Sequence, residues 1–169
     1  MRDKKIWIFN AGNVFDGNPK WLFMYIVNYR KDITPYWFCY TEEARDYIRK
    51  LGYQVFLFKS KMAEKIGSQA GVYVVNQKKE IFQDYLKGIT VLNLWHGVGC
   101  KTVEKGVTYG FLNERIIKKH IINMDCYQNY QLFLVTSPLM EKHFIKQCDL
   151  AEDKIIRAGY PCCFYPGKI

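Results

Sequence analysis

Short apolar runs alternate with longer amphipathic stretches along most of the chain. The runs are rich in Val, Ile, Phe, Trp and Tyr and are bounded by turn residues, which is typical of β-strands. Strands separated by helical patterns of 10–15 residues indicate βαβ units. We therefore expect an α/β, Rossmann-like domain with a largely parallel sheet of about six to seven strands and helices on both faces. The expected strands are Lys5–Phe9, Tyr36–Tyr40, Gln54–Phe58, Val72–Val75, Ile89–Leu94, Leu132–Thr136 and Lys154–Ala158.

Helix start and stop residues stand between these runs. Ser, Thr and Asn cap helices by accepting backbone N–H groups, Pro fits the first turn, and Gly ends helices. The expected helices are one capped by Asn18 that runs to about Tyr29, one from Thr41 to Gly52, one from Ser60 ended by Gly71, one over Lys78–Lys87, one over Phe111–Met124 and one from Pro138 to about Cys148.

One segment, 102–131, interrupts this rhythm and is predicted to be a helical insertion in a single domain of residues 1–169. Its helix carries Arg115, Lys118 and Lys119 beside an apolar stripe. Such a helix either packs its stripe on the sheet or lies on an anionic membrane surface, with Tyr109 and Phe111 as interfacial anchors. The sequence pattern is the same in both cases.

The chain has 25 Lys and Arg residues against 16 Asp and Glu residues, which gives a formal net charge of +9. This balance favours polyanionic partners. The basic residues are spread along the chain and no RRM, KH or helix-turn-helix signature is present, so nucleic acid is not the expected partner. A non-catalytic basic module that binds nucleic acid or another polyanion is the alternative hypothesis.

Cysteine and histidine spacing predicts no metal site. The six cysteines form no C-x-x-C pair and the three histidines are scattered, so zinc-ligand spacing is absent. Ser137 lacks a Gly-x-Ser-x-Gly context and is expected to cap a helix rather than act as a nucleophile. Neither a secretory signal nor an apolar run of about 18 residues is found, and reduced cytoplasmic thiols are expected.

The first candidate for chemistry is the loop Asn10–Lys20, which follows the first expected strand. Ligands of open α/β sheets bind outside the carboxyl ends of the strands. The loop's glycines and the following helix N-terminus suit a phosphate, with Asn13 and Asn18 as candidate contacts. The loop matches neither a dinucleotide fingerprint nor a P-loop. An ordinary Asn/Gly-rich turn is the alternative.

The second candidate is the loop Trp95–Lys101, directly after an apolar strand. His96 at a strand's carboxyl end is well placed to act as a general base, because its ordinary pKa near 6.5 lets it accept a proton from a hydroxyl group. Gly97 and Gly99 leave backbone N–H groups open to an anion, and Lys101 adds a positive charge for phosphate. A structural histidine is the alternative.

These elements occur in a recognisable order: Phe9, Asp16-Gly-Asn-Pro-Lys-Trp-Leu-Phe, Leu94-Trp-His-Gly-x-Gly-x-Lys101, a Ser137-Pro helix and Gly159-Tyr-Pro161. Over about residues 6–161 the chain resembles the amino-terminal part of the CDP-glycerol glycerophosphotransferases, the teichoic acid primases and polymerases. The resemblance departs at Val98-Gly99-Cys100, where the family has Thr-Pro-Leu, and at Cys162, where it has arginine.

The resemblance implies one half of a GT-B-type enzyme, with the donor-binding half beyond Ile169. It implies that His96 deprotonates an acceptor hydroxyl, which attacks the β-phosphate of CDP-glycerol or a related CDP-alditol. No tightly bound cofactor is implied. The expected acceptor is lipid-linked or polymeric and belongs to a cell-surface polymer such as a wall or capsule. The expected location is cytoplasmic, peripheral on the inner face of the membrane, and this chain alone is expected to be inactive.

Overall fold

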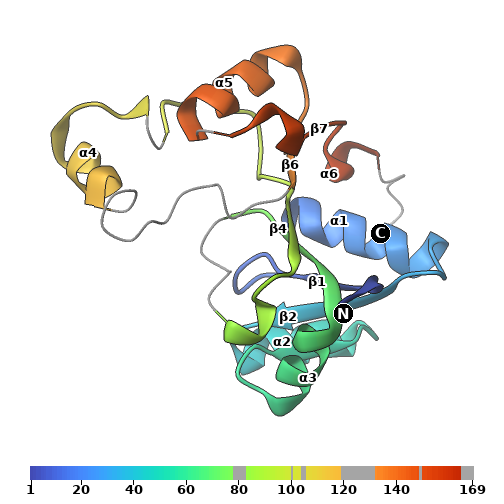
Figure 1. The fold of residues 1–169 in the computed structure, drawn as a ribbon. Helices are drawn as coiled ribbons and strands as arrows, with labels where there is room; N and C mark the ends of the chain where they lie inside the picture. Colours follow the sequence, from blue (N-terminus) through green and yellow to red (C-terminus); the bar gives the residue numbers. More distant parts are fainter. Residues whose placement is uncertain (78–82, 100, 104–105, 119–131, 149, 165–169) are drawn as a thin grey trace.

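The computed structural model describes residues 1–77, 83–99, 101–103, 106–118, 132–148 and 150–164. Its centre is an all-parallel sheet in the order β3-β2-β1-β4-β5-β6-β7 (Figure 1). The predicted Rossmann-like fold is therefore confirmed. The strands are β1 (Asp3–Phe9), β2 (Thr34–Cys39), β3 (Val55–Leu57), β4 (Ala70–Val75), β5 (Thr90–Asn93), β6 (Leu132–Val135) and β7 (Ile155–Arg157).

The order in which the chain adds parallel strands to the sheet reverses between β1 and β4. Strands β2 and β3 extend the sheet on one side of β1, and β4 to β7 extend it on the other. In doubly wound sheets the ligand crevice opens at such a switch point, outside the carboxyl ends of the strands. The loops after β1, β4 and β5 are thereby brought to one edge.

Helices cover this sheet on both sides, and Figure 1 shows α1 and α3 on opposite sides of β1. The helices are α1 (Gly17–Tyr29), α2 (Glu42–Lys50), α3 (Lys61–Gln69), α4 (Gly110–Ile117), α5 (Pro138–Cys148) and α6 (Pro161–Phe164), with 3₁₀ turns η1 (Asp84–Leu86) and η5 (Glu152–Lys154). Helix α6 contacts α1, so the end of the described chain returns to its beginning.

Neighbouring residues of β2 supply the core on both faces of the sheet. Side chains alternate along a strand, so Trp37 and Phe38 point to opposite faces, and both are fully buried. Trp37 packs edge-on against Phe23 of α1, with ring centroids 5.6 Å apart. Phe38 packs against Phe58 on the other face at 5.4 Å. Burial on both faces explains why these strands show little apolar and polar alternation.

Three predicted helix caps are confirmed. The hydroxyl oxygens of Thr41, Ser60 and Ser137 accept the backbone N–H three residues later, at 3.3, 3.2 and 3.2 Å. Each bond satisfies an N–H group that the first helical turn leaves without a partner. Serine and threonine therefore set the starts of α2, α3 and α5 by local chemistry alone.

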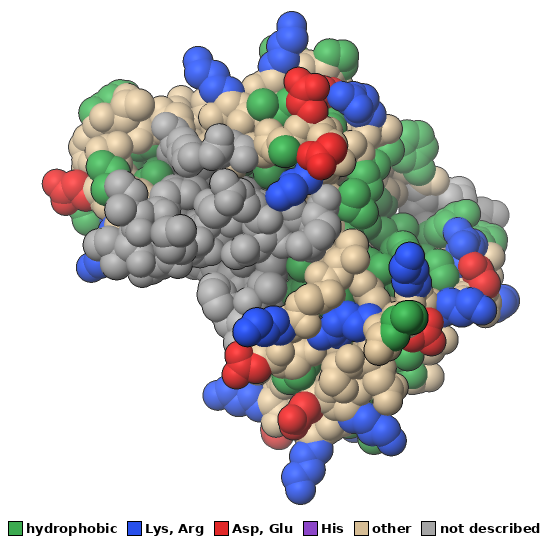
Figure 2. Space-filling model, viewed as in Figure 1, with side chains coloured by type: hydrophobic (Ala, Val, Ile, Leu, Met, Phe, Trp, Pro, Cys, Tyr) green, Lys and Arg blue, Asp and Glu red, His purple; other side chains and the backbone are tan. Residues whose placement is uncertain are grey.

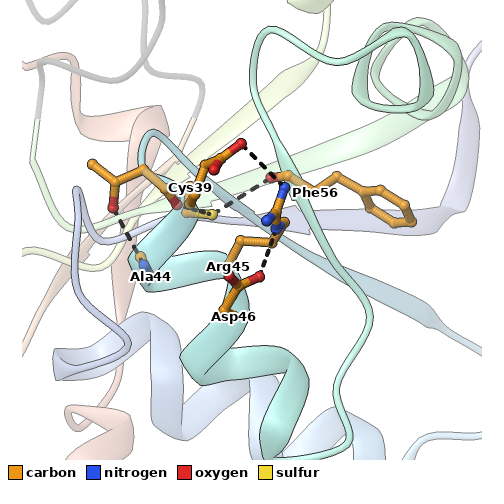
Figure 3. Close-up of polar contacts among 7 residues, drawn as sticks. Cys39, Ala44, Arg45, Asp46 and Phe56 are labelled. Carbon is orange, nitrogen blue, oxygen red and sulfur yellow. Dashed lines mark hydrogen bonds and ion pairs between the residues drawn. The ribbon is translucent and has the colours of Figure 1, made fainter.

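The Thr41 cap belongs to a compact junction between β2 and α2 (Figure 3). The Cys39 thiol lies 3.6 Å from the carbonyl oxygen of Thr41 and 3.8 Å from that of Phe56 on β3. Arg45 pairs with Asp46 at 2.9 Å on the outer side of the helix. Burial raises the pKa of the Cys39 thiol to about 11, so this cysteine is a protonated core residue.

Two predicted helix boundaries are wrong. Asp16, not Asn18, is the N-cap of α1, and its side chain makes no capping bond. Helix α3 ends at Gln69, and Gly71 lies inside β4. A Cβ atom at Gly71 would stand 2.6 Å from the carbonyl oxygen of Asp3, where the register of β1 and β4 shifts. Gly71 thus permits close strand approach and does not end a helix.

The expected helix Lys78–Lys87 is not formed in its described part. Residues 78–82 lie outside the described residues, and only the 3₁₀ turn Asp84–Leu86 follows. Tyr85 packs its ring on Gly67, where a Cβ would approach to 2.3 Å, and its hydroxyl donates to the carbonyl oxygen of Phe58 at 2.8 Å. Packing of this aromatic residue against α3 overrides the local helical pattern.

Candidate active site

The loops after β1 and β5 meet at the carboxyl edge of the sheet. Asn10, at the end of β1, is fully buried, and its amide donates to the carbonyl oxygen of Phe38 at 2.8 Å. Its Oδ1 accepts the N–H of Gly12 at 2.9 Å, which turns the chain toward α1. On the other loop, the backbone N–H of Leu94 bonds to Val75 of β4 at 2.8 Å. Both loops are therefore anchored on the central strands.

The residue before His96 has an unusual backbone. Trp95 adopts φ +54°, and it is the one residue other than glycine with positive φ in the described part of the chain. Its indole is buried against Phe133 and Phe144, with ring centroids 5.6 and 5.1 Å away, and these two phenyl rings also contact each other at 5.1 Å. The left-handed turn leaves the following residue, His96, at the surface while the indole stays in the core.

His96 stacks on this indole. The two ring centroids are 4.3 Å apart and the planes are inclined by 24°. Partial burial lowers the pKa of His96 from its ordinary value of 6.5, because desolvation disfavours the charged imidazolium. The imidazole is therefore neutral and open to solvent at neutral pH, as a general base requires.

The two glycines after His96 have different surroundings. Gly97 has φ +155° and open space where a Cβ would stand, and its carbonyl oxygen accepts the hydroxyl of Tyr160 at 2.6 Å. At Gly99 a Cβ would lie 2.9 Å from the ring of His143. The N–H of Gly99 points to the Met140 sulfur at 3.2 Å. The Gly99 N–H is therefore directed at α5 in this structure, and its contact with an anion stays a prediction.

The three remaining residues predicted to contact phosphate differ in their exposure to solvent. Asn13 and Lys101 are exposed, Asn13 in the loop after β1 and Lys101 beyond Cys100, which is outside the described residues. Asn18 is buried, and its amide donates to the carbonyl oxygens of Trp95 at 2.9 Å and Leu94 at 3.3 Å. Asn18 thus joins the two loops, and its side chain is turned to the protein rather than to a ligand.

The predicted membrane-surface residues lie away from this edge. Arg115 and Lys118 are exposed on and directly after α4, which Figure 1 places at a distance from the sheet. Lys119, like the rest of the expected helix to Met124, lies outside the described residues. No residue of α4 is buried, and Tyr109 and Phe111 are 84% and 70% exposed. The described apolar stripe is therefore not packed on the sheet.

Charge on the face of the molecule seen in Figure 2 is dispersed. Figure 2 shows Lys and Arg side chains scattered over the visible face among acidic and apolar ones.

Within the described ranges no group of His, Cys, Asp and Glu has the arrangement of a metal site. No helix in the described part of the chain is long and apolar enough to span a membrane.

Sequence reasoning missed two residues of this edge, Asn93 and Tyr160. Asn93 ends β5, is fully buried, and its Oδ1 accepts the N–H of Trp95 at 2.8 Å. Tyr160 reaches the loop from the segment after β7. An asparagine at the end of an apolar strand was a usable signal for Asn93, because buried amides require specific partners. Nothing local in the sequence links Tyr160 to Gly97.

Comparison with known proteins identifies the family. The family model described as CDP-Glycerol:Poly(glycerophosphate) glycerophosphotransferase matches residues 1–163, and the chain belongs to this family. The resemblance drawn from the Trp95–Lys101 loop is thereby confirmed. No curated protein sequence matches significantly.

Solved structures show the same fold at low sequence identity. A single-residue variant of the wall teichoic acid polymerase TagF matches with a TM-score of 0.71 and 16% identity over 95% of this chain and 40% of the TagF chain. A TagF variant soaked with CDPG gives 0.72 and 17%, with the same coverage. HepE of Anabaena, in complex with UDP and glucose, gives 0.53 and 14% over 94% of this chain and 45% of HepE. This chain thus spans less than half the length of these structures.

Proposed function

We propose that this chain is the acceptor-side domain of a glycerophosphotransferase that moves glycerol phosphate, or another alditol phosphate, from a CDP-activated donor to a lipid-linked or polymeric acceptor. The observation that carries the proposal is His96, a neutral and exposed imidazole held at the carboxyl edge of the sheet in a member of this family. The structure of a TagF variant soaked with CDPG supports a CDP-alditol as the donor class.

In this proposal His96 takes the proton of an acceptor hydroxyl group. The resulting oxygen nucleophile attacks the β-phosphorus of CDP-glycerol, a new P–O bond forms, and the bond to the CMP phosphate breaks. CMP leaves with the bonding electron pair, and the proton stays on the imidazole until it passes to solvent. A general base of this kind contributes about 10²–10⁴-fold to the rate.

Other residues of the edge have binding roles in the proposal. Lys101 and the open backbone at Gly97 attract phosphate charge beside His96, and Asn13 offers an exposed amide from the neighbouring loop. Asn18 supports the site from beneath, because its amide is bonded to the carbonyl oxygen of Trp95. Cys162 stands where the family has arginine, so a further phosphate contact expected of relatives is replaced here by a thiol.

The donor is proposed to be held by a second, carboxy-terminal domain. The family fold and the 40% coverage of TagF support this division, since the present domain matches one part of a longer enzyme. Helix α4 and the residues after it are proposed to contact an anionic membrane surface where a lipid-linked acceptor is found, through the exposed Arg115 and Lys118 and through Lys119, which lies outside the described residues. This would place the enzyme in the cytoplasm, peripheral to the membrane.

The decisive experiment measures CMP release from CDP-glycerol by the complete protein with a glycerol phosphate acceptor. His96→Gln should lower turnover by at least about 100-fold. Lys101→Ala should raise KM for the acceptor, and Lys59→Ala, a matched loss of an exposed lysine, should leave it unchanged. A His96→Gln enzyme with more than a third of normal turnover would remove His96 from the mechanism. Tight, salt-dependent binding of oligonucleotides without CMP release would favour the polyanion-binding alternative.

A further inference from the structure

Two buried asparagines hold the peptide groups on either side of the Trp95 α-carbon. The Oδ1 atom of Asn93 accepts the N–H of Trp95 at 2.8 Å, and the Nδ2 of Asn18 donates to the carbonyl oxygen of Trp95 at 2.9 Å. Asn93 is fully buried and Asn18 is 3% exposed. The two side chains come from different elements, β5 and the first turn of α1. Trp95 is thus fixed from both sides.

The backbone of Trp95 requires such support. A bulky residue with positive φ is strained by about 1–3 kcal/mol, and it persists only where its surroundings favour that conformation. Hydrogen bonds to the N–H and the C=O of the same residue select one backbone orientation. Both bonds are buried and shielded from competing water, which strengthens them.

This backbone orientation also fixes the position of the His96 imidazole. The indole packs against Phe133 and Phe144, and the imidazole of His96 stacks on the indole with ring centroids 4.3 Å apart. If Trp95 relaxed to negative φ, the indole and the His96 backbone would rotate relative to each other. The stack between them would then be lost.

A role in core packing alone does not explain Asn93. Its Nδ2 is buried without a hydrogen-bond partner among the described residues, which costs free energy that an apolar side chain of similar size would not. The asparagine therefore provides something that packing does not, and among the described residues the hydrogen bond of its side chain goes to Trp95. We propose that Asn93 and Asn18 are positioning residues that lock Trp95 in its left-handed turn and thereby hold the His96 imidazole against the indole, facing the acceptor. This inference rests on the proposed function of His96.

The test uses NMR spectroscopy of the 169-residue chain, so it does not depend on catalysis. The stacked indole shifts the ring protons of His96 by its ring current, and these signals are assigned by loss in His96→Gln. Asn93→Ala and Asn18→Ala should each abolish the shift and move the His96 pKa back toward 6.5. Asn93→Asp, which keeps an acceptor for the Trp95 N–H, should restore the ring-current shift.

Asn10→Ala is the matched control. Asn10 is also a fully buried asparagine at a strand end, but its amide bonds to Phe38 and Gly12 and not to Trp95. This variant should lose stability and keep the His96 ring-current shift. Because Asn93 and Asn18 lie on different elements, one alanine variant still gives the answer when the other does not fold.

Two further outcomes separate this inference from the proposed function. A ring-current shift that persists in both folded alanine variants overturns the positioning role, whatever the activity. In the complete enzyme we expect both variants to lower kcat by about tenfold or more with little change in KM, because a small displacement of a base slows proton transfer. Loss of the shift with unchanged kcat would uphold the positioning of His96 and overturn its role as the base.

Discussion

The hydroxyl group of Tyr160 donates a 2.6 Å hydrogen bond to the carbonyl oxygen of Gly97, the residue directly after His96. The bond joins the end of the β7 segment to the loop after β5, across 63 residues of sequence. Tyr160 is 8% exposed, and burial raises its pKa, so the phenol remains protonated and able to donate. The candidate catalytic loop is therefore held by the last part of the described domain.

Tyr160→Phe should loosen this loop. Removing the hydroxyl leaves the Gly97 carbonyl without its donor, at a cost of about 1 kcal/mol in the free energy of unfolding. Urea denaturation measures this loss, and Tyr47→Phe, at an exposed tyrosine, is the control with no expected change. Equal midpoints for Tyr160→Phe and the unaltered protein would show that the bond contributes nothing to stability.

The rate of the complete enzyme should depend on pH through His96. Because desolvation lowers the pKa of His96 in the folded protein below 6.5, this base stays neutral to a lower pH than a free histidine. The acidic limb of kcat/KM should therefore fall below pH 6.5. The same sign applies to stability: the contribution of neutral His96 is complete above pH 6.5 and is lost as pH falls through the folded pKa. An acidic limb centred above 6.5 would contradict this assignment.

Arg2 should contribute strongly to stability despite its position at the start of the chain. Its guanidinium donates to four carbonyl oxygens, of Gly67, Ala70, Tyr85 and Lys87, at 2.6–2.8 Å. These bonds tie the end of α3 and the η1 turn to β1, and a planar fork is required to reach them. Arg2→Met should lower the free energy of unfolding by about 2–3 kcal/mol.

Arg2→Lys and Lys4→Met provide the comparisons for that measurement. A lysine ammonium has three donors and cannot reach four carbonyls, so Arg2→Lys should recover only part of the loss. Lys4 is exposed, and Lys4→Met should have little effect. Thermal melts followed by circular dichroism rank the three variants. An Arg2→Met protein as stable as Lys4→Met would show that the four hydrogen bonds of Arg2 do not stabilise the fold.

The α4 segment should bind anionic vesicles. Each basic residue near an anionic leaflet contributes about 1 kcal/mol, so reversing Arg115, Lys118 and Lys119 to Glu should weaken vesicle binding by well over tenfold. Vesicle sedimentation measures the effect. The matched control reverses three exposed lysines near α3: Lys59, Lys61 and Lys65. Unchanged sedimentation of the α4 variant, with the fold intact by circular dichroism, would show that the segment is not a membrane contact.

Much of the fold is readable from the sequence because its signals are local. Strands β1 to β7 can be recognised by their runs of aromatic and β-branched residues, since parallel strands are buried on both faces. The hydroxyls of Thr41 and Ser60 act on backbone groups three residues away. His96 stands out because it directly follows such a strand, where α/β sheets bind ligands. These features depend on neighbours that the sequence itself places together.

The support of the candidate site was decided by the tertiary structure. Asn18 reads as a helix cap in sequence, but its amide bonds to Trp95, 77 residues away. Gly71 reads as a helix end, but the close approach of β1 places it in a strand. The left-handed turn of Trp95 has no signature at all in residues 94–96. Each depends on a hydrogen bond or a steric contact that forms only when distant segments meet, so no local pattern of residues encodes it.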